Sequence, residues 1–166
     1  MKKIAILMGS RSDLEAVKPA YDVIREFGVE CDMRIISAHR TPEICEEFSR
    51  KAVKNGYGVI IAAAGKAAHL GGVIAAFTSL PVLGIPIKSS TMDGMDSLLS
   101  MVQMPSGVPV ACVGINGALN AGLYAVQMLG IRDKELNKKM LIYKQNMADK
   151  VASEDNKLQQ ELKSNK

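Results

Sequence analysis

The stretch G-V-I-I-A-A-A-G-K-A-A-H-L-G-G-V-I-A-A-F-T-S-L-P-V-L-G-I, residues 58–85, decides the fold. Its apolar ends, 58–63 and 81–85, have the length and composition of strands, and residues 67–79 between them fit a helix. Both strands are nearly continuous in hydrophobicity, which is typical of parallel strands that are covered on both faces. The stretch therefore predicts two parallel strands joined by a right-handed helical crossover.

The same alternation of strands and helices runs along the rest of the chain. Short connections between such units predict an α/β protein with a three-layer, doubly wound, five-stranded parallel sheet. The expected strand order is 2-1-3-4-5, which is flavodoxin-like. The predicted strands are 3–8, 31–36, 58–63, 81–85 and 109–115, and the predicted helices are 12–27, 41–54, 67–79, 92–103 and 117–130.

The chain divides into a domain over 1–131 and a C-terminal helix over 132–166. In the second part, apolar residues recur at steps of three or four and form one stripe. A long helix beyond a complete domain needs a surface to cover, and two placements remain open: a neighbouring subunit, or the helix's own domain. Residues from 153 onward are polar enough to fray. The stripe consists of Leu136, Met140, Tyr143, Met147 and Val151.

Composition excludes several classes of protein. The chain has 166 residues, is 48% hydrophobic and 23% charged, and has no apolar run long enough to span a membrane. The apolar run at 3–8 is too short for a signal peptide and leads into G-S-R-S-D, so we expect a first strand and a cytoplasmic protein. Three widely spaced cysteines without a C-x-x-C pair indicate free thiols, with neither a zinc site nor a disulfide framework.

The net charge of +4 is not a nucleic-acid signature. Residues 1–131 hold 12 Lys/Arg and 11 Asp/Glu, and residues 132–166 hold 9 and 6, so most of the excess lies in the C-terminal helix among acidic residues. The chain has four Tyr, three Phe and no Trp, which disfavours a platform for stacked bases. We expect neither a nucleic-acid nor a membrane partner.

The two histidines of the chain, His39 and His69, each follow a predicted strand. Ligands of open α/β sheets bind at the carboxyl ends of strands, and histidine suits proton transfer near neutral pH. In S-A-H-R-T-P, residues 37–42, His39 is flanked by Ser37 and by Arg40, whose guanidinium can bind phosphate through two hydrogen bonds. A structural and a catalytic role for His39 both remain open on these residues alone.

Two further loops follow predicted strands. In M-G-S-R-S-D, residues 8–13, Ser10 and the start of a helix offer an anion cradle, and Asp13 can accept hydrogen bonds from a sugar diol. Helix capping by Ser12 and Asp13 explains the same residues. This loop is neither a Walker loop nor a dinucleotide fingerprint.

The other loop, A-A-A-G-K-A-A-H-L-G-G at 62–72, is built from small residues that let the backbone approach a ligand. Lys66 supplies positive charge there, and His69 either orients a substrate or packs at a helix start. Ser89, Ser90 and Thr91 follow the fourth strand and are expected at the same edge. Asp93 and Asp96 lack companion acids, so no metal site is predicted.

Together these motifs closely resemble N5-carboxyaminoimidazole ribonucleotide mutases, the family of the catalytic subunit of phosphoribosylaminoimidazole carboxylase. The resemblance covers about residues 3–151 and rests on M-G-S-R-S-D, I-S-A-H-R-T-P, A-A-G-K-A-A-H-L-G-G, L-P-V-L-G-I-P and D-S-L-L-S-M-V-Q-M-P-S-G-V-P.

The resemblance implies conversion of N5-carboxyaminoimidazole ribonucleotide to 4-carboxy-5-aminoimidazole ribonucleotide, with no metal, nucleotide or organic cofactor. It also implies a homo-octamer whose C-terminal helices pack on neighbouring subunits. His39 is then the general acid/base, and His69 lies in the loop over the imidazole and carboxylate. By the resemblance, Ser10, Asp13 and Arg40 bind the substrate and Ser37 lies near the phosphate. In the small-residue loop we also expect Gly65, Lys66 and Leu70 to bind the substrate.

The third loop departs from the family pattern G-A-G-G-A-A-H-L-P-G. Ala63 and Lys66 replace two glycines, and Gly71 replaces the proline. A direct carboxylase that uses CO2 and aminoimidazole ribonucleotide shares the fold but has a different loop in place of A-A-H-L, so residues 67–70 favour the mutase. A non-catalytic module for FMN or a nucleotide is the more remote alternative, disfavoured by the lack of aromatic residues in these loops.

Overall fold

The structure is a computed structural model that describes residues 2–164. Its centre is a five-stranded parallel sheet in the order β2-β1-β3-β4-β5, which confirms the predicted topology. The register pairs Ile6 of β1 with Met33 of β2 and with Ile61 of β3. The strands are β1 (Lys3–Met8), β2 (Cys31–Ile35), β3 (Tyr57–Gly65), β4 (Val82–Ile87) and β5 (Ala111–Cys112).

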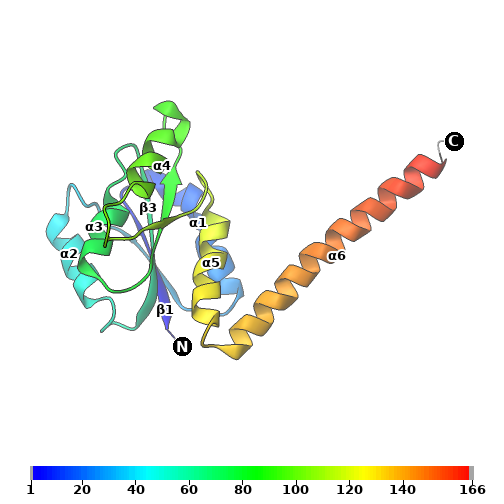
Figure 1. Cartoon of the computed structure of the whole chain (residues 1–166), viewed down its shortest axis with the longest axis horizontal. Coiled ribbons are helices and arrows are strands. Elements are labelled where there is room, and N and C mark those ends of the chain that lie inside the picture. The colour runs from blue at the N-terminus through cyan, green and yellow to red at the C-terminus, as the bar shows by residue number, and fades with distance from the viewer. Residues whose placement is uncertain (1, 165–166) are drawn as a thin grey trace.

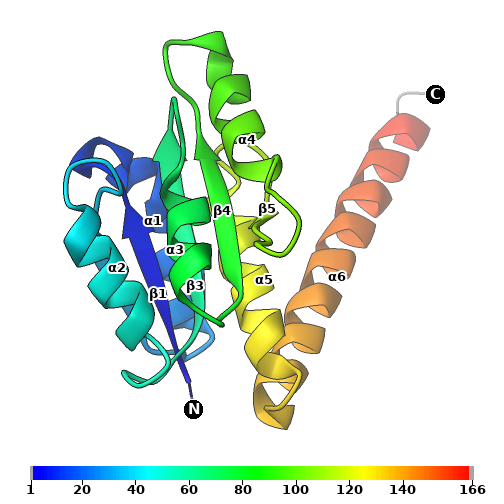
Figure 2. The same ribbon diagram turned by 60° about the vertical axis from the view of Figure 1, so that its left-hand side comes forward.

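Helices cover both faces of this sheet, as Figure 2 shows. α1 and α5 pack on one face, and α2, α3 and α4 pack on the other. A short 3-10 turn, η1 (Arg11–Asp13), precedes α1, and another, η2 (Met92–Gly94), precedes α4. The α-helices are α1 (Leu14–Glu26), α2 (Pro42–Lys51), α3 (Leu70–Phe77), α4 (Met95–Val102), α5 (Ala118–Gly130) and α6 (Lys134–Ser164).

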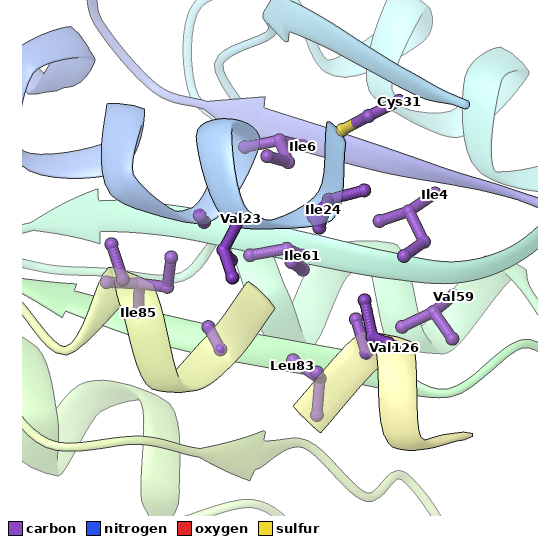
Figure 3. Close-up of a cluster of buried hydrophobic side chains, with 14 of the residues drawn as sticks. Ile4, Ile6, Val23, Ile24, Cys31, Val59, Ile61, Leu83, Ile85 and Val126 are labelled. Carbon is purple, nitrogen blue, oxygen red and sulfur yellow. The ribbon is translucent and has the colours of Figure 1, made fainter. Parts of the chain in front are cut away.

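Alternating strand residues supply the two hydrophobic cores. Ile4 and Ile6 of β1 enter the core beneath α1 and α5, which Figure 3 shows, whereas Ala5 and Leu7 enter the core on the opposite face. Because parallel strands buried on both faces need apolar residues at every position, the strands read as continuous apolar runs in the sequence.

The contact between α1 and α5 requires a glycine. A Cβ at Gly122 would lie 2.5 Å from Val23 Cγ1 and 2.8 Å from the backbone oxygen of Ala20. The two helices can therefore approach this closely only where α5 has no side chain.

The fifth strand is much shorter than the predicted 109–115. It is an edge strand whose residues Ala111 and Cys112 pair only with β4. Pro109 has no N–H to donate to the ladder, and Asn116 has φ of 55° in the turn that leads to α5. Conversely, β4 runs two residues further than predicted, to Ile87.

The C-terminal helix packs on its own domain only at its start. Leu136 and Met140 are buried, the Tyr143 ring lies 5.7 Å from that of Phe27, and Lys139 Nζ donates to the Phe27 carbonyl at 2.9 Å. Beyond these turns α6 extends away from the domain (Figures 1 and 2). There the later members of the predicted stripe are exposed: Met147 is 48% exposed and Val151 is 65% exposed.

The helix continues to Ser164, so the expectation of fraying from residue 153 is wrong up to that residue. Side-chain hydrogen bonds at a spacing of four, such as Gln145 to Asp149 at 2.8 Å, bind successive turns to one another. Residues 165–166 of the predicted C-terminal segment, and Met1, lie outside the described residues. Across 2–164, no helix combines the length and apolarity of a membrane span.

Candidate active site

A cavity of about 660 Å³ opens at the carboxyl edge of the sheet. Loops that follow β1, β2, β3 and β4 line it, because parallel strands all end at this edge. Ser89 and Ser90 line it as expected, whereas Thr91 does not. The cavity brings together every predicted site residue: Ser10, Asp13, Ser37, His39, Arg40, Gly65, Lys66, His69 and Leu70.

Lys88 also lines the cavity, and sequence reasoning missed it. The predicted fourth strand ended at residue 85, which placed Lys88 inside a connecting loop. Since β4 ends at Ile87, Lys88 is the first residue after the strand. A strand boundary two residues later would have identified it.

Arg40 ties two of the loops together. Its Nη2 donates to the Gly9 carbonyl at 2.6 Å, and its Nε donates to Ser37 Oγ at 3.4 Å. Within residues 2–164 the guanidinium forms no ion pair. The loops after β1 and β2 thus present a positive group whose charge is not neutralised by a salt bridge.

The residue that caps the first helical turn is Ser10. Its Oγ accepts a hydrogen bond from the Ser12 backbone N–H at 3.3 Å and lies 2.9 Å from Ser12 Oγ. The predicted capping by Ser12 and Asp13 is therefore wrong for η1, and Asp13 makes no cap bond to α1. The turn starts at Arg11, one residue before the predicted start at residue 12, because Arg11–Asp13 form a polar 3-10 turn.

Asp13 lies half-buried in the cavity wall. Burial raises the pKa of its carboxyl above the usual value of 3.8, although the hydrogen bond from Ser12 and the charge of Arg40 act in the opposite direction. The Ser12 hydroxyl donates to Asp13 Oδ1 at 3.2 Å. The carboxylate can accept further hydrogen bonds from a ligand hydroxyl in this partly desolvated position.

The two histidines meet in the cavity. His39 Nε2 lies 2.9 Å from His69 Nδ1, the ring centroids are 5.0 Å apart, and the ring planes are nearly perpendicular at 88°. One nitrogen must carry a proton and the other must accept it, so the tautomers of the two rings are linked. His69 precedes α3 but makes no capping bond with its side chain. The geometry therefore allows a proton to pass between two imidazoles.

The loop after β3 has a backbone that favours glycine. Lys66 has φ of 57°, in the left-handed region. A Cβ at Gly65 would lie 3.3 Å from the carbonyl of Ile87 on the neighbouring strand. Leu70 is 3% exposed and joins the core beneath the loop while it lines the cavity floor.

The charge of the cavity suits an anion. Arg40, Lys66 and Lys88 contribute three positive charges and Asp13 one negative charge, a net +2 with neutral histidines. The part of the chain that the structure describes holds no group of three or more His, Cys, Asp or Glu residues arranged to bind a metal. The three cysteines are free thiols outside the cavity lining.

Comparison with known proteins identifies the family. The AIR carboxylase family matches residues 3–150. The chain belongs to the AIR carboxylase family. This confirms the resemblance inferred from the motifs of the loops.

Two curated relatives show the range of the family. The N5-carboxyaminoimidazole ribonucleotide mutase of Saccharolobus solfataricus is 50% identical over 153 residues, which cover 92% of this chain and 97% of the relative. The chloroplastic phosphoribosylaminoimidazole carboxylase of Vigna aconitifolia is also 50% identical, over 156 residues that cover 95% of this chain but 28% of that protein. This chain thus matches the mutase end to end and only one part of the carboxylase.

A solved structure has the same fold. The crystal structure of Treponema denticola PurE superimposes with a TM-score of 0.86 at 29% identity, covering 93% of this chain and 97% of that chain. The five-stranded parallel sheet with helices on both sides is therefore the fold of an experimentally determined relative.

Proposed function

We propose that this protein is an isomerase of purine biosynthesis that converts N5-carboxyaminoimidazole ribonucleotide to 4-carboxy-5-aminoimidazole ribonucleotide. The observation that carries the proposal is the hydrogen bond of 2.9 Å between His39 and His69 inside a cationic cavity. The end-to-end match to a mutase supports the same reaction.

The substrate fits the cavity as a ribonucleotide with two anionic ends. Arg40, Ser37 and Ser10 bind the phosphate, since a guanidinium and hydroxyls from adjoining loops converge there. Asp13 accepts hydrogen bonds from the ribose diol. The aminoimidazole then lies over the loop that contains Gly65 and within reach of the histidines.

The reaction transfers one CO2 from the exocyclic nitrogen to C4, and the proton taken up in the first step is balanced by the proton lost in the last. Protonation of the exocyclic nitrogen breaks its bond to the carboxyl carbon and releases CO2 and aminoimidazole ribonucleotide. The ring carbon C4 is enamine-like and attacks that CO2, which forms the new C–C bond. Loss of the C4 proton to a base restores the aromatic ring, so the proton count balances without an oxidant or a reductant.

His39 is the group we propose for both proton transfers. A base that gives a proton in the first half and takes one in the second regenerates itself in each turnover. His69 accepts from or donates to His39, orients its ring and shapes the loop over the imidazole. Retention of CO2 in the cavity replaces a bimolecular encounter with a local one.

The decisive experiment replaces His39 with Asn and measures conversion of N5-carboxyaminoimidazole ribonucleotide. We expect turnover to fall by about 10²- to 10⁴-fold, which is the usual contribution of general acid–base catalysis. Aminoimidazole ribonucleotide should still bind. His69→Asn should cause the smaller loss. Near-normal turnover in His39→Asn would refute the assignment.

The direct carboxylase is the alternative function. It predicts carboxylation of aminoimidazole ribonucleotide that rises with bicarbonate, whereas the mutase converts its substrate at low bicarbonate. The A-A-H-L sequence at 67–70 favours the mutase. Because we propose chemistry that needs no metal or organic cofactor, turnover should not change after treatment with a chelator.

We also propose that the protein is a cytoplasmic homo-octamer. The distal part of α6 supports assembly, because it extends away from the domain (Figures 1 and 2) and its apolar side chains include Leu158 and Leu162, which are 50% and 54% exposed. Substitution of Met147 and Val151 by Gln leaves the buried start of the helix intact. A smaller mass in solution is expected, and an unchanged mass would contradict this role of the helix.

A further inference from the structure

Two lysines lie side by side at the end of neighbouring strands in the cavity. The register pairs Gly65, the last residue of β3, with Ile87, the last residue of β4, on strands about 4.8 Å apart, and Lys66 and Lys88 directly follow these two residues. Both side chains are exposed and both line the cavity. Two positive charges that follow neighbouring strands favour the binding of an anion at this part of the cavity.

This pair stands apart from the phosphate end of the cavity. Arg40 follows β2, the edge strand, and β1 separates β2 from β3. The cavity therefore has one cationic pole after β2 and a second after β3 and β4. A ligand that pairs with both cationic poles carries two anionic groups separated by a neutral part.

Neither lysine is held by a strong partner. Lys66 forms no ion pair within residues 2–164, and Lys88 Nζ lies 3.2 Å from Asp93, with side chains that are 56% and 86% exposed. Exposed ion pairs contribute little free energy. The Lys88 ammonium can therefore leave the Asp93 carboxylate and bind a ligand carboxylate instead.

The backbone at Lys66 gives a second reason to assign this side chain a role. Its φ of 57° lies in the left-handed region, which costs energy for a residue with a long side chain. Backbone strain of this kind gathers at functional sites, which fits the position of Lys66 in the cavity lining.

We propose that Lys66 and Lys88 together bind the carboxyl group that migrates. This inference rests on the proposed function. The carboxyl leaves the exocyclic nitrogen and arrives on the adjacent ring carbon, so one pair of cations reaches both positions. As C4 attacks CO2, negative charge develops on the CO2 oxygens, and the lysines favour this recapture over escape of CO2.

The test compares Lys66→Met, Lys88→Met and the double variant with Lys54→Met, an exposed lysine in the turn before β3 at the opposite end of the sheet. Substrate labelled with ¹³C in its carboxyl group is converted in unlabelled bicarbonate. Each single variant should raise KM about tenfold, as expected for one exposed charge-assisted contact, and the product should retain less label. Affinity for aminoimidazole ribonucleotide, which lacks the carboxyl, should not change.

Four outcomes separate the possibilities. Wild-type KM and label retention in the double variant would overturn the inference, as would an equal loss of affinity for aminoimidazole ribonucleotide, because the lysines would then contact another part of the nucleotide. Lys66→Gly, which removes the backbone strain, should show the same defect as Lys66→Met if the charge matters. A wild-type protein that does not convert the substrate would instead refute the proposed function.

Discussion

Replacement of Arg40 by Ala should separate binding from stability. Without ligand the guanidinium makes one short hydrogen bond, to Gly9 O at 2.6 Å, and one long one, to Ser37 Oγ at 3.4 Å. The side chain is exposed, so water can replace it at the Gly9 carbonyl. We therefore expect the free energy of unfolding to fall by no more than about 1 kcal/mol.

The effect on binding should be larger. Loss of a charge-assisted pair with phosphate weakens binding by about 2–4 kcal/mol, which corresponds to roughly 30- to 700-fold in Kd. The assay is titration of wild type and Arg40→Ala with aminoimidazole ribonucleotide and with the riboside that lacks the phosphate. The ribonucleotide should distinguish the two proteins and the riboside should not, because the cycle isolates the contact between guanidinium and phosphate.

Arg50→Ala is the matched control, since this exposed arginine of α2 pairs with Glu46 at 2.8 Å, lies 4.7 Å from the centre of the Phe77 ring, and is outside the cavity lining. Its ligand affinity should equal that of wild type. If the riboside showed the same loss as the ribonucleotide in Arg40→Ala, the arginine would act by holding the Gly9 loop in place, and the phosphate assignment would be wrong.

Three other predictions concern stability and reactivity. Gly122→Ala should lower the free energy of unfolding by about 1–3 kcal/mol, because the new Cβ would lie 2.8 Å from the Ala20 backbone and overpack the contact. Gly130→Ala in the same helix is the control and should not lower it, because the nearest neighbour of its Cβ is 3.6 Å away. Equal melting temperatures of the two variants would contradict this prediction. Burial raises the pKa of Asp13 above 3.8, so its ionisation costs stability as the pH rises through the folded-state pKa. Asp13→Asn should therefore melt higher at pH 7, with a difference that shrinks towards pH 4, and bind the ribonucleotide less well; a lower melting temperature at pH 7 would refute the sign. Burial raises the pKa of the Cys31 thiol to about 12, with a smaller contribution from a nearby carboxylate, so alkylation followed by mass spectrometry should find it unmodified until denaturant is added.

The sequence predicted the sheet because each strand is marked by its own residues. Runs such as V-I-I-A-A at 59–63 are too apolar for an exposed strand and too short for a helix of average length, and their alternation with helices limits the topology. The site followed from the same topology, since the carboxyl ends of parallel strands meet at one edge. Residues as distant as Ser10 and Leu70 were therefore placed in one cavity without knowledge of any distance.

The features that the sequence did not predict are contacts between loops that lie far apart in the chain. The hydrogen bond from Arg40 to Gly9 spans 31 positions, and the pair of His39 and His69 spans 30. No local pattern encodes either of them. The length of the edge strand β5 was overestimated because the apolar run at 109–115 resembles a strand, although only Ala111 and Cys112 pair with β4.

The two edges of the sheet differ in whether their charged side chains form ion pairs. At the amino edge, Lys3 Nζ lies 2.8 Å from Asp32 and the Tyr57 hydroxyl donates to the same carboxylate at 2.5 Å, which lowers the pKa of Asp32. At the carboxyl edge, Arg40 and Lys66 have no ion-pair partner among residues 2–164, and Lys66 is also strained.

A chain selected only for stability would pair these charges, as it does at the amino edge, and would place glycine at residue 66. Local conflicts of this kind gather where a ligand resolves them. The proposed substrate carries a phosphate and a carboxylate, which match these unpaired cations in charge. The unpaired cations therefore support a ligand with two anionic groups, and the two hydrogen-bonded histidines support the proton transfer that we propose for its conversion.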